Sequence, residues 1–112
     1  LRLCAAHGGG FLPWYSFRFD HAHSVRPEAG RCRRAPSDYL KRIYFDTVVY
    51  EPENLQRLVA KVGVSQVVLG TDYPFDMGNY DVHRIVGEAS GLTSLEIDQV
   101  LGGNARRLLN LN

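Results

Sequence analysis

Short apolar runs alternate with segments of helical periodicity along this chain. Three runs, at residues 1–6, 43–49 and 66–69, predict β-strands, and the middle run is rich in β-branched and aromatic residues. Between Pro52 and Gly63, leucines and valines recur with a helical period, and these two residues suit the first turn and the end of a helix. Further helices are expected over residues 36–42, 79–89 and 92–101. Alternation of strands and helices predicts an α/β fold with a parallel sheet.

The ends of several helices are marked by specific residues. A helix across part of 15–26 is only weakly signalled, because Pro13 and Pro27 act as breakers on either side. Thr93 and Glu96 have the spacing of a capping box, in which side chain and backbone satisfy each other's donors. Gly102-Gly103 predicts a break in the helix, after which Asn104 would cap a last helix.

The length of the chain indicates an incomplete sheet. It has 112 residues, whereas a full (β/α)8 barrel has about 250. Three parallel strands leave unpaired backbone groups at both outer edges. The chain also begins at Leu1 and not at Met. We therefore expect a piece of a longer protein, or a chain that completes its sheet with another subunit. A catalytically silent remnant or oligomerisation fragment is a further alternative.

Composition and charge exclude several function classes. The hydrophobic content of 45% and charged content of 22% are typical of a globular domain, and the net charge of +1 gives no reason to expect nucleic acid or an anionic membrane. No apolar run approaches the roughly 18 residues of a membrane span, and no secretory signal opens the chain. We expect a cytoplasmic location with a free, buried Cys4. The arginines and lysines of residues 26–42 are expected to form a solvated surface.

The strongest chemical signal is a histidine and an aspartate, each following a predicted strand. His7 precedes three glycines, and Asp72 lies in the segment GTDYPF. A histidine and a carboxylate at the carboxyl ends of parallel strands suggest the mouth of a β/α barrel and a divalent metal. His7 as a strand-end hydrogen-bonding residue and Asp72 as a turn residue are the plainer alternatives. A metal normally needs three or four protein ligands, and this chain offers one or two.

Other polar residues are less decisive. Arg18 stands among aromatic residues, where a guanidinium suits a substrate carboxylate; pairing with Asp20 or stacking on a ring are the plainer alternatives. His21 and His23 form a His-x-His pair in a polar stretch without strand pattern, which favours surface histidines over metal ligands. Asp46 interrupts an apolar strand, and a buried carboxylate needs a partner. It is either a site residue or a structural hydrogen-bond acceptor.

Several segments together resemble a known family. AAHGGGFLPWYSFRFDHAH, YFDTVVYEPENL, VVLGTDYPFDMG and the closing GGNARRLLNL are similar to the C-terminal part of the amidohydrolase-related (amidohydrolase 2) metal-dependent decarboxylases, in particular the aminocarboxymuconate semialdehyde decarboxylase branch. The resemblance covers essentially all of residues 1–112 but only about the last third of a family member. It implies the C-terminal portion, about three β/α units, of a metal-dependent-hydrolase-type TIM barrel.

The resemblance also implies an activity and roles for four residues. His7 would act in proton transfer beside a metal-bound water, and Asp72 would ligate one divalent metal, usually zinc. Arg18 would bind a substrate carboxylate, in the family sometimes across a homodimer interface, and Phe75 would line the pocket. The implied reaction is non-oxidative decarboxylation of a small conjugated or aromatic carboxylic acid. A metal-dependent hydrolase of the same superfamily is the alternative, because activated water can attack a carbonyl with nearly the same residues.

Two departures from the family pattern stand out. The His-x-His of the family's first strand and the metal-ligating histidine of its fifth strand have no counterpart here, since His21 and His23 lie in the wrong place. Phe17 stands before the arginine where a small residue is usual. We therefore expect the isolated chain to be inactive and the parent protein to be the enzyme.

Overall fold

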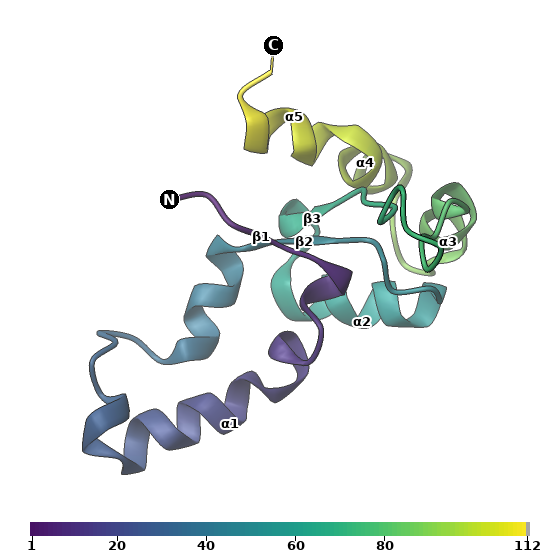
Figure 1. Ribbon diagram of the computed structural model, residues 1–112. Coiled ribbons are helices and arrows are strands. Elements are labelled where there is room, and N and C mark those ends of the chain that lie inside the picture. Colours follow the sequence, from purple (N-terminus) through teal and green to yellow (C-terminus); the bar gives the residue numbers. More distant parts are fainter. Residues whose placement is uncertain (112) are drawn as a thin grey trace.

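The protein is described by a computed structural model over residues 1–111, built around a three-stranded parallel sheet (Figure 1). The strands β1 (Cys4–Ala5), β2 (Tyr44–Asp46) and β3 (Val67–Val68) lie in sequence order. Ala5 pairs with Phe45, and Phe45 with Val67. The predicted α/β fold with parallel strands is confirmed. The strands are shorter than the apolar runs that predicted them.

The helices follow the strands in the predicted alternation. They are α1 (Leu12–Val25), α2 (Pro52–Val62), α3 (Val82–Glu88), α4 (Ser94–Asp98) and α5 (Asn104–Leu109). Short 3-10 segments are η1 (His7–Gly9), η2 (Pro27–Ala29), η3 (Pro36–Arg42) and η4 (Val64–Gln66), and η5 (Gln99–Gly103) is a π-helical turn. The capping box of Thr93 and Glu96 forms as predicted, at the start of α4.

The core lies between the sheet and the helices that follow β2 and β3. Leu55, Leu58 and Val62 of α2 are at most 2% exposed and pack with Phe45 of the central strand. Helix α3 adds Ile85 and Val86, and η5 adds Val100. Burial of side chains this size contributes roughly 1.5 to 3 kcal/mol each, so α2 forms because its apolar face is covered. The helix predicted from the apolar period between Pro52 and Gly63 is therefore confirmed.

The predicted break at Gly102-Gly103 is wrong. Helix α4, the π turn η5 and α5 run on without interruption, with helical backbone angles at Gly103 (φ −56°, ψ −41°). Glycine costs a helix only about 1 kcal/mol per residue relative to alanine, and burial of Val100 outweighs it. The π turn also leaves the carbonyl of Val100 free to accept a hydrogen bond from the amide of Leu69, at 3.0 Å.

Asn104 does not cap a last helix, as the sequence suggested. Its fully buried side chain donates from Nδ2 to the carbonyls of Val64, at 2.8 Å, and Val67, at 2.7 Å. Its Oδ1 accepts a hydrogen bond from Arg107 Nη2. Both carbonyls belong to the segment that enters β3. Asn104 therefore attaches the C-terminal helix to the end strand of the sheet.

The N-terminal third differs from its sequence reading in two respects. Helix α1 is longer than the weak signal over 15–26 indicated, because Pro13 lies in its first turn and does not interrupt it. Cys4 is exposed, which corrects the expected buried thiol. It lies on the edge strand β1, whose outer side has no neighbour among the described residues. Phe11, just before α1, and Tyr15 and Phe17 on α1 are more than half exposed.

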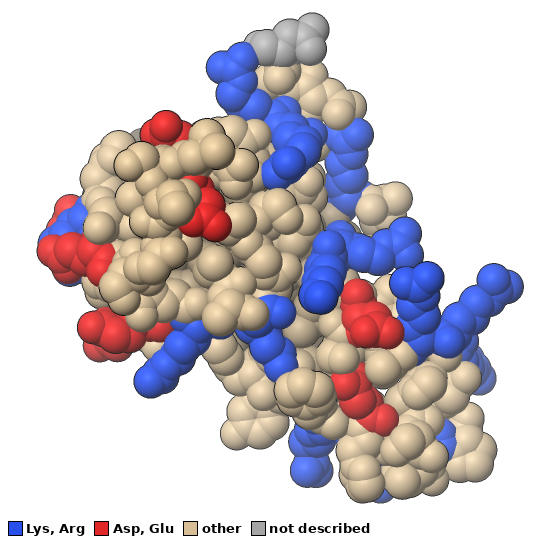
Figure 2. All heavy atoms as spheres, turned by 180° about the vertical axis from the view of Figure 1, so that it is seen from behind, with Lys and Arg blue, Asp and Glu red and all other residues tan. Residues whose placement is uncertain are grey.

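Charged side chains are unevenly distributed over the surface. Figure 2 shows Lys and Arg gathered along one side of the molecule, with most Asp and Glu on the other. The basic residues of the 26–42 segment are all exposed, as expected for a solvated surface: Arg26, Arg31, Arg33, Arg34, Lys41 and Arg42. Within residues 1–111, none of the helices combines the length and apolar character required to cross a membrane.

Candidate functional site

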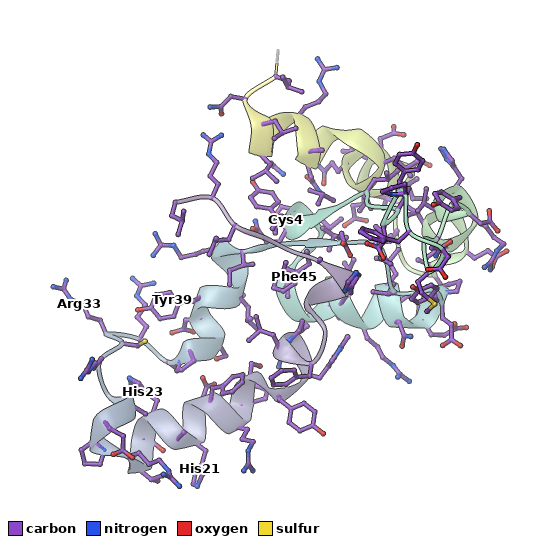
Figure 3. The ribbon with its side chains drawn as sticks, viewed as in Figure 1. Cys4, His21, His23, Arg33, Tyr39 and Phe45 are labelled. Atoms are coloured by element: carbon purple, nitrogen blue, oxygen red, sulfur yellow. The ribbon has the colours of Figure 1, made fainter. Side chains whose placement is uncertain are left out.

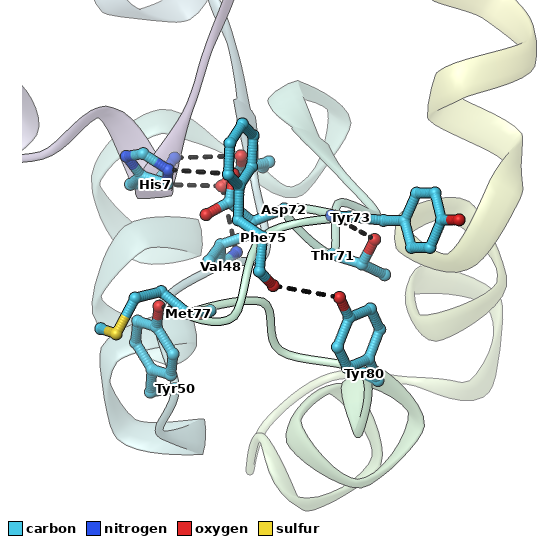
Figure 4. A network of polar contacts seen from close by, with 11 residues as sticks. His7, Val48, Tyr50, Thr71, Asp72, Tyr73, Phe75, Met77 and Tyr80 are labelled. Atoms are coloured by element: carbon cyan, nitrogen blue, oxygen red, sulfur yellow. Dashed lines mark hydrogen bonds and ion pairs between the residues drawn. The ribbon is translucent and has the colours of Figure 1, made fainter.

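The candidate site is a hollow formed by the loops that follow the three strands. It has a volume of about 490 Å³ and is lined by His7, Tyr50, Asp72, Phe75, Asp76 and Met77. His7 follows β1, Tyr50 follows β2, and the remaining four follow β3 (Figure 4). Parallel strands bring their carboxyl ends to one edge of the sheet, where α/β proteins bind their ligands. Three of the four predicted site residues, His7, Asp72 and Phe75, thus line one hollow.

Three of the residues that line the hollow have a strained backbone. His7 (φ 55°), Tyr50 (φ 65°) and Asp72 (φ 62°) adopt left-handed conformations, one after each strand. In residues 1–111 the only other non-glycine residue with positive φ is Asn110, at the end of α5. Such a conformation costs a non-glycine residue about 1 to 2 kcal/mol. Strained residues of this kind concentrate at functional sites, where the surrounding contacts hold them.

His7 and Asp72 face each other across the hollow. His7 Nε2 lies 3.4 Å from Asp72 Oδ1, and the two side chains are 59% and 23% exposed. An imidazole can take up and release a proton near neutral pH. A carboxylate contributes a hard, negatively charged oxygen ligand to a divalent cation. The pair joins a proton carrier and a cation ligand at a position open to small molecules.

One wall of the hollow is the loop of residues 73–77 after β3, here called the aromatic loop. Phe75 is 64% exposed and Met77 66% exposed, so both present apolar surface to the hollow. Two tyrosine hydroxyls hold the backbone of this loop. The Tyr50 hydroxyl donates to the carbonyl of Met77, at 2.6 Å, and the Tyr80 hydroxyl donates to that of Phe75, at 3.2 Å. These bonds hold the main chain of the loop in place, and they leave the side chains of Phe75 and Met77 available to contact a ligand.

Asp46 and Thr47, at the end of β2, connect the three loops. The Asp46 carboxylate accepts hydrogen bonds from the amides of His7, Gly8 and Val48, at 2.8 to 3.0 Å. The fully buried Thr47 Oγ1 exchanges two bonds of 3.1 Å with the amide and carbonyl of Gly70. Of the two roles left open for Asp46, these contacts favour the structural acceptor.

The residues of this chain fit a divalent metal only in part. His7 and Asp72 are suitable ligand types at a suitable separation. No group of three or more histidine, cysteine, aspartate or glutamate side chains that could hold a metal lies anywhere in residues 1–111. A stable protein site uses three or four such ligands. A metal at this hollow would therefore need further ligands from outside the described chain.

Arg18 lies apart from His7 and Asp72. It is exposed on α1 and lines a separate, smaller hollow with His21, Ala22, Val25 and Arg26. His23, on the same helix, lies near the loop after α1, and its Nε2 donates to the carbonyl of Cys32 at 2.7 Å (Figure 3). The His-x-His pair thus forms part of the α1 surface. Within one copy of this chain Arg18 does not join the His7 hollow.

Sequence reasoning missed three residues of the hollow: Tyr50, Asp76 and Met77. Tyr50 had a usable signal, because it directly follows the apolar run 43–49. It thereby occupies the position after β2 that His7 and Asp72 occupy after β1 and β3. The position of Met77 depends on the path of an irregular loop, which has no periodicity to interpret.

The fold and the hollow together define an α/β protein whose site lies at the carboxyl ends of parallel strands. The family model described as amidohydrolase (Amidohydro_2) matches residues 1–111, and the chain belongs to this family. It is 38% identical to 2-amino-3-carboxymuconate-6-semialdehyde decarboxylase of Caenorhabditis elegans and 32% identical to the protein of that name in Dictyostelium discoideum. Each match covers 100% of this chain but 28% and 32% of those relatives, so the chain spans about a third of their length.

Solved structures give the same picture of the fold. A crystal structure of IDCase from Metarhizium anisopliae superposes with a TM-score of 0.81 at 30% identity, over 99% of this chain and 34% of that one. A dihydroxybenzoic acid decarboxylase from Polaromonas, described with bound manganese and an inhibitor, superposes with a TM-score of 0.82 at 24% identity. It matches 100% of this chain and 34% of its own. The resemblance to this family expected from the sequence is confirmed.

Proposed function

We propose that this chain is the C-terminal part of a metal-dependent, non-oxidative decarboxylase that acts on a small conjugated or aromatic carboxylic acid. The observation that carries the proposal is the approach of His7 Nε2 to within 3.4 Å of Asp72 Oδ1, in a hollow at the carboxyl ends of the strands. The decarboxylase names of the two curated relatives support the same reaction class. The remaining strands of a TIM barrel would precede β1 and close the sheet.

His7 is the proton-transfer residue in this proposal. Decarboxylation without an oxidant replaces the C–CO2⁻ bond with a C–H bond, so a proton must reach the carbon that carries the carboxylate. As CO2 leaves, the electron pair of the broken bond stays on the substrate and restores its conjugation. The exposed imidazole of His7 is placed to manage that proton. The three following glycines carry no side chains that would compete for space beside the imidazole.

Asp72 is the metal ligand that this chain contributes. When bound, a divalent metal would attract the negative oxygens of substrate or water and stabilise charge that develops during the reaction. We expect zinc, as the family resemblance implies, and manganese is the alternative that one structural relative suggests. The other ligands would come from the strands that precede β1 in the complete protein.

The substrate would lie against the aromatic loop. Phe75 offers an apolar face to a conjugated or aromatic acid. Arg18 lines a different hollow within its own chain. It would therefore reach the His7 hollow of a second subunit and bind the carboxylate of the substrate held there. The exposed aromatic residues at the start of α1, Phe11, Tyr15 and Phe17, favour a homodimer interface near Arg18.

The test uses the complete protein that contains this chain, with CO2 release and metal content measured on the same sample. We expect metal-dependent CO2 release from a conjugated or aromatic acid. His7→Ala should lower kcat by about 10²- to 10⁴-fold while the metal stays bound. Asp72→Asn should lose metal. Matched controls are His83→Ala and Asp38→Asn, which change an exposed histidine and an exposed aspartate that do not line the hollow.

Two results would overturn the proposal. One is a metal-loaded protein that releases no CO2 from such acids but hydrolyses a lactone or amide, which would establish the hydrolase alternative. The other is a His7→Ala variant with unchanged kcat. The dimer is tested separately by mixing inactive His7→Ala and Arg18→Ala subunits. Regained activity in the mixture would show that one site uses residues from two chains.

A further inference from the structure

The loop that carries His7 has an unusual backbone. Four consecutive residues, His7 to Gly10, have positive φ, between 55° and 78°. Glycine adopts these angles freely, but histidine does not. Glycine is also required sterically in the middle of this run. A Cβ at Gly8 would lie 2.5 Å from Val49 Cγ1, and one at Gly9 would lie 2.7 Å from the Phe45 ring. The run is therefore pressed against β2 and the loop after it.

The Asp46 carboxylate is the group that holds this backbone. Its Oδ2 accepts the amide of His7 at 2.9 Å, and its Oδ1 accepts the amide of Gly8 at 2.8 Å. Consecutive amides in left-handed residues converge on one side of the chain and form a small concave site for an anion. Here the Asp46 carboxylate of the neighbouring strand fills that site. The pairing turns both amides inward and leaves the imidazole of His7 facing the hollow.

Asp46 is itself held from two sides. Its Oδ1 also accepts the amide of Val48, two residues further along, at 3.0 Å. On the other side Gly70 lies so close that a Cβ there would be 2.7 Å from Asp46 Cβ and 3.2 Å from its Cγ. The carboxylate therefore has a fixed orientation. Because its oxygens are engaged by three backbone donors, it is not placed to ligate a metal or to take a proton from substrate.

We propose that Asp46 is the positioning residue for His7. It fixes the left-handed turn of the main chain after β1, and through that turn it fixes where the imidazole meets the substrate. The proposal rests on the role of His7 in proton transfer under the proposed function. Asp46 makes no contact with the reacting atoms and acts only through His7. A displacement of about 1 Å at a reacting group can cost about 10²-fold in rate.

The decisive experiment is a double-mutant cycle in the complete, metal-loaded protein. Asp46→Asn keeps the shape of the side chain but replaces one accepting oxygen with a donor. We expect kcat to fall about 10- to 100-fold, with KM and metal content close to wild type. In a His7→Ala background the same substitution should change the residual kcat less than threefold, because the group that Asp46 positions is already gone. Asp38→Asn, at an exposed aspartate on η3, is the matched control and should leave kcat unchanged.

A second measurement does not depend on activity. In the wild-type protein the amides of His7 and Gly8 should exchange with solvent slowly, and Asp46→Asn should speed both while amides in α2 stay protected. If the variant does not fold, the wild-type exchange still decides: rates equal to those of an unstructured chain would overturn the proposal. So would an Asp46→Asn effect of the same size in both backgrounds, or wild-type kcat in Asp46→Asn. Unchanged kcat in His7→Ala alone would instead refute the proposed function of His7.

Discussion

Replacement of Asn104 gives a sharp test of how the C-terminal helix is attached. The buried amide donates to the carbonyls of Val64 and Val67, and no other side chain in residues 1–111 donates to them. Asn104→Ala removes two hydrogen bonds, each worth about 1 kcal/mol net, and leaves the Val67 carbonyl without its side-chain donor, at about 1 to 3 kcal/mol, whereas the Val64 carbonyl still accepts from the amide of Val67. The expected loss in the free energy of unfolding is therefore about 3 to 5 kcal/mol, near the upper end for single substitutions.

Asn104→Asp separates hydrogen bonding from shape. Aspartate has nearly the same size, but it would place a carboxylate oxygen about where Nδ2 lies, facing two carbonyls at 2.7 and 2.8 Å. An isosteric replacement that repels its partners should destabilise the protein at least as much as alanine does at pH 7. If packing alone mattered, aspartate would be the milder change.

The assay is urea-induced unfolding of the complete protein, followed by circular dichroism. Asn54→Ala is the control, because its amide makes longer bonds of 3.3 and 3.4 Å from a half-buried position. It should cost about 1 kcal/mol or less. An Asn104→Asp variant as stable as wild type would refute the role assigned to the amide donors.

Three further outcomes can be checked on the complete protein. Gly8→Ala should lose about 2 kcal/mol of stability by thermal unfolding, because its Cβ meets Val49 Cγ1 at 2.5 Å, and Val49→Ala should recover part of that loss. Tyr50→Phe removes the hydroxyl that holds the aromatic loop, so steady-state kinetics should show KM raised about three- to tenfold with little change in kcat. Hydrogen bonds from the Thr93 amide and hydroxyl lower the pKa of Glu96. This stabilisation is present above the unfolded pKa of glutamate and is lost as the pH falls. Thr93→Ala should therefore lower Tm more at pH 7 than at pH 3.

The sequence predicted best where burial and periodicity agree. Helix α2 could be placed from Leu55, Leu58 and Val62 because one buried face sets its period. The meeting of His7 and Asp72 could also be foreseen, since both follow strands of a parallel sheet and such strands end at a common edge. Neither inference required knowledge of a long-range contact beyond the strand order.

What could not be predicted depends on tertiary contacts that leave no local pattern. The continuous helix through Gly103 depends on the packing of Val100 and Asn104 against β3, which outweighs the low helix propensity of glycine. The role of Asp46 depends on which groups lie opposite its carboxylate, and the sequence does not show which way a side chain at the end of a strand points. Arg18 could be identified as a type of residue that binds carboxylates. That it lines a separate hollow on α1, and not the hollow of His7, depends on the tertiary structure.

The π turn η5 has a consequence for how this protein tolerates insertions and deletions. A π turn contains one residue more than the α-helical turn that would replace it. Removal of either glycine would convert the π turn into an α-helical turn, which keeps the Asn104 amide on its side of the helix but takes the Val100 carbonyl into the helix and away from the amide of Leu69. Replacement of Gly102 by a larger residue meets no atom within 4 Å of the new Cβ. At this glycine pair the length of the chain is therefore constrained more tightly than its chemistry, so homologous proteins should vary in side chain there and keep the residue count.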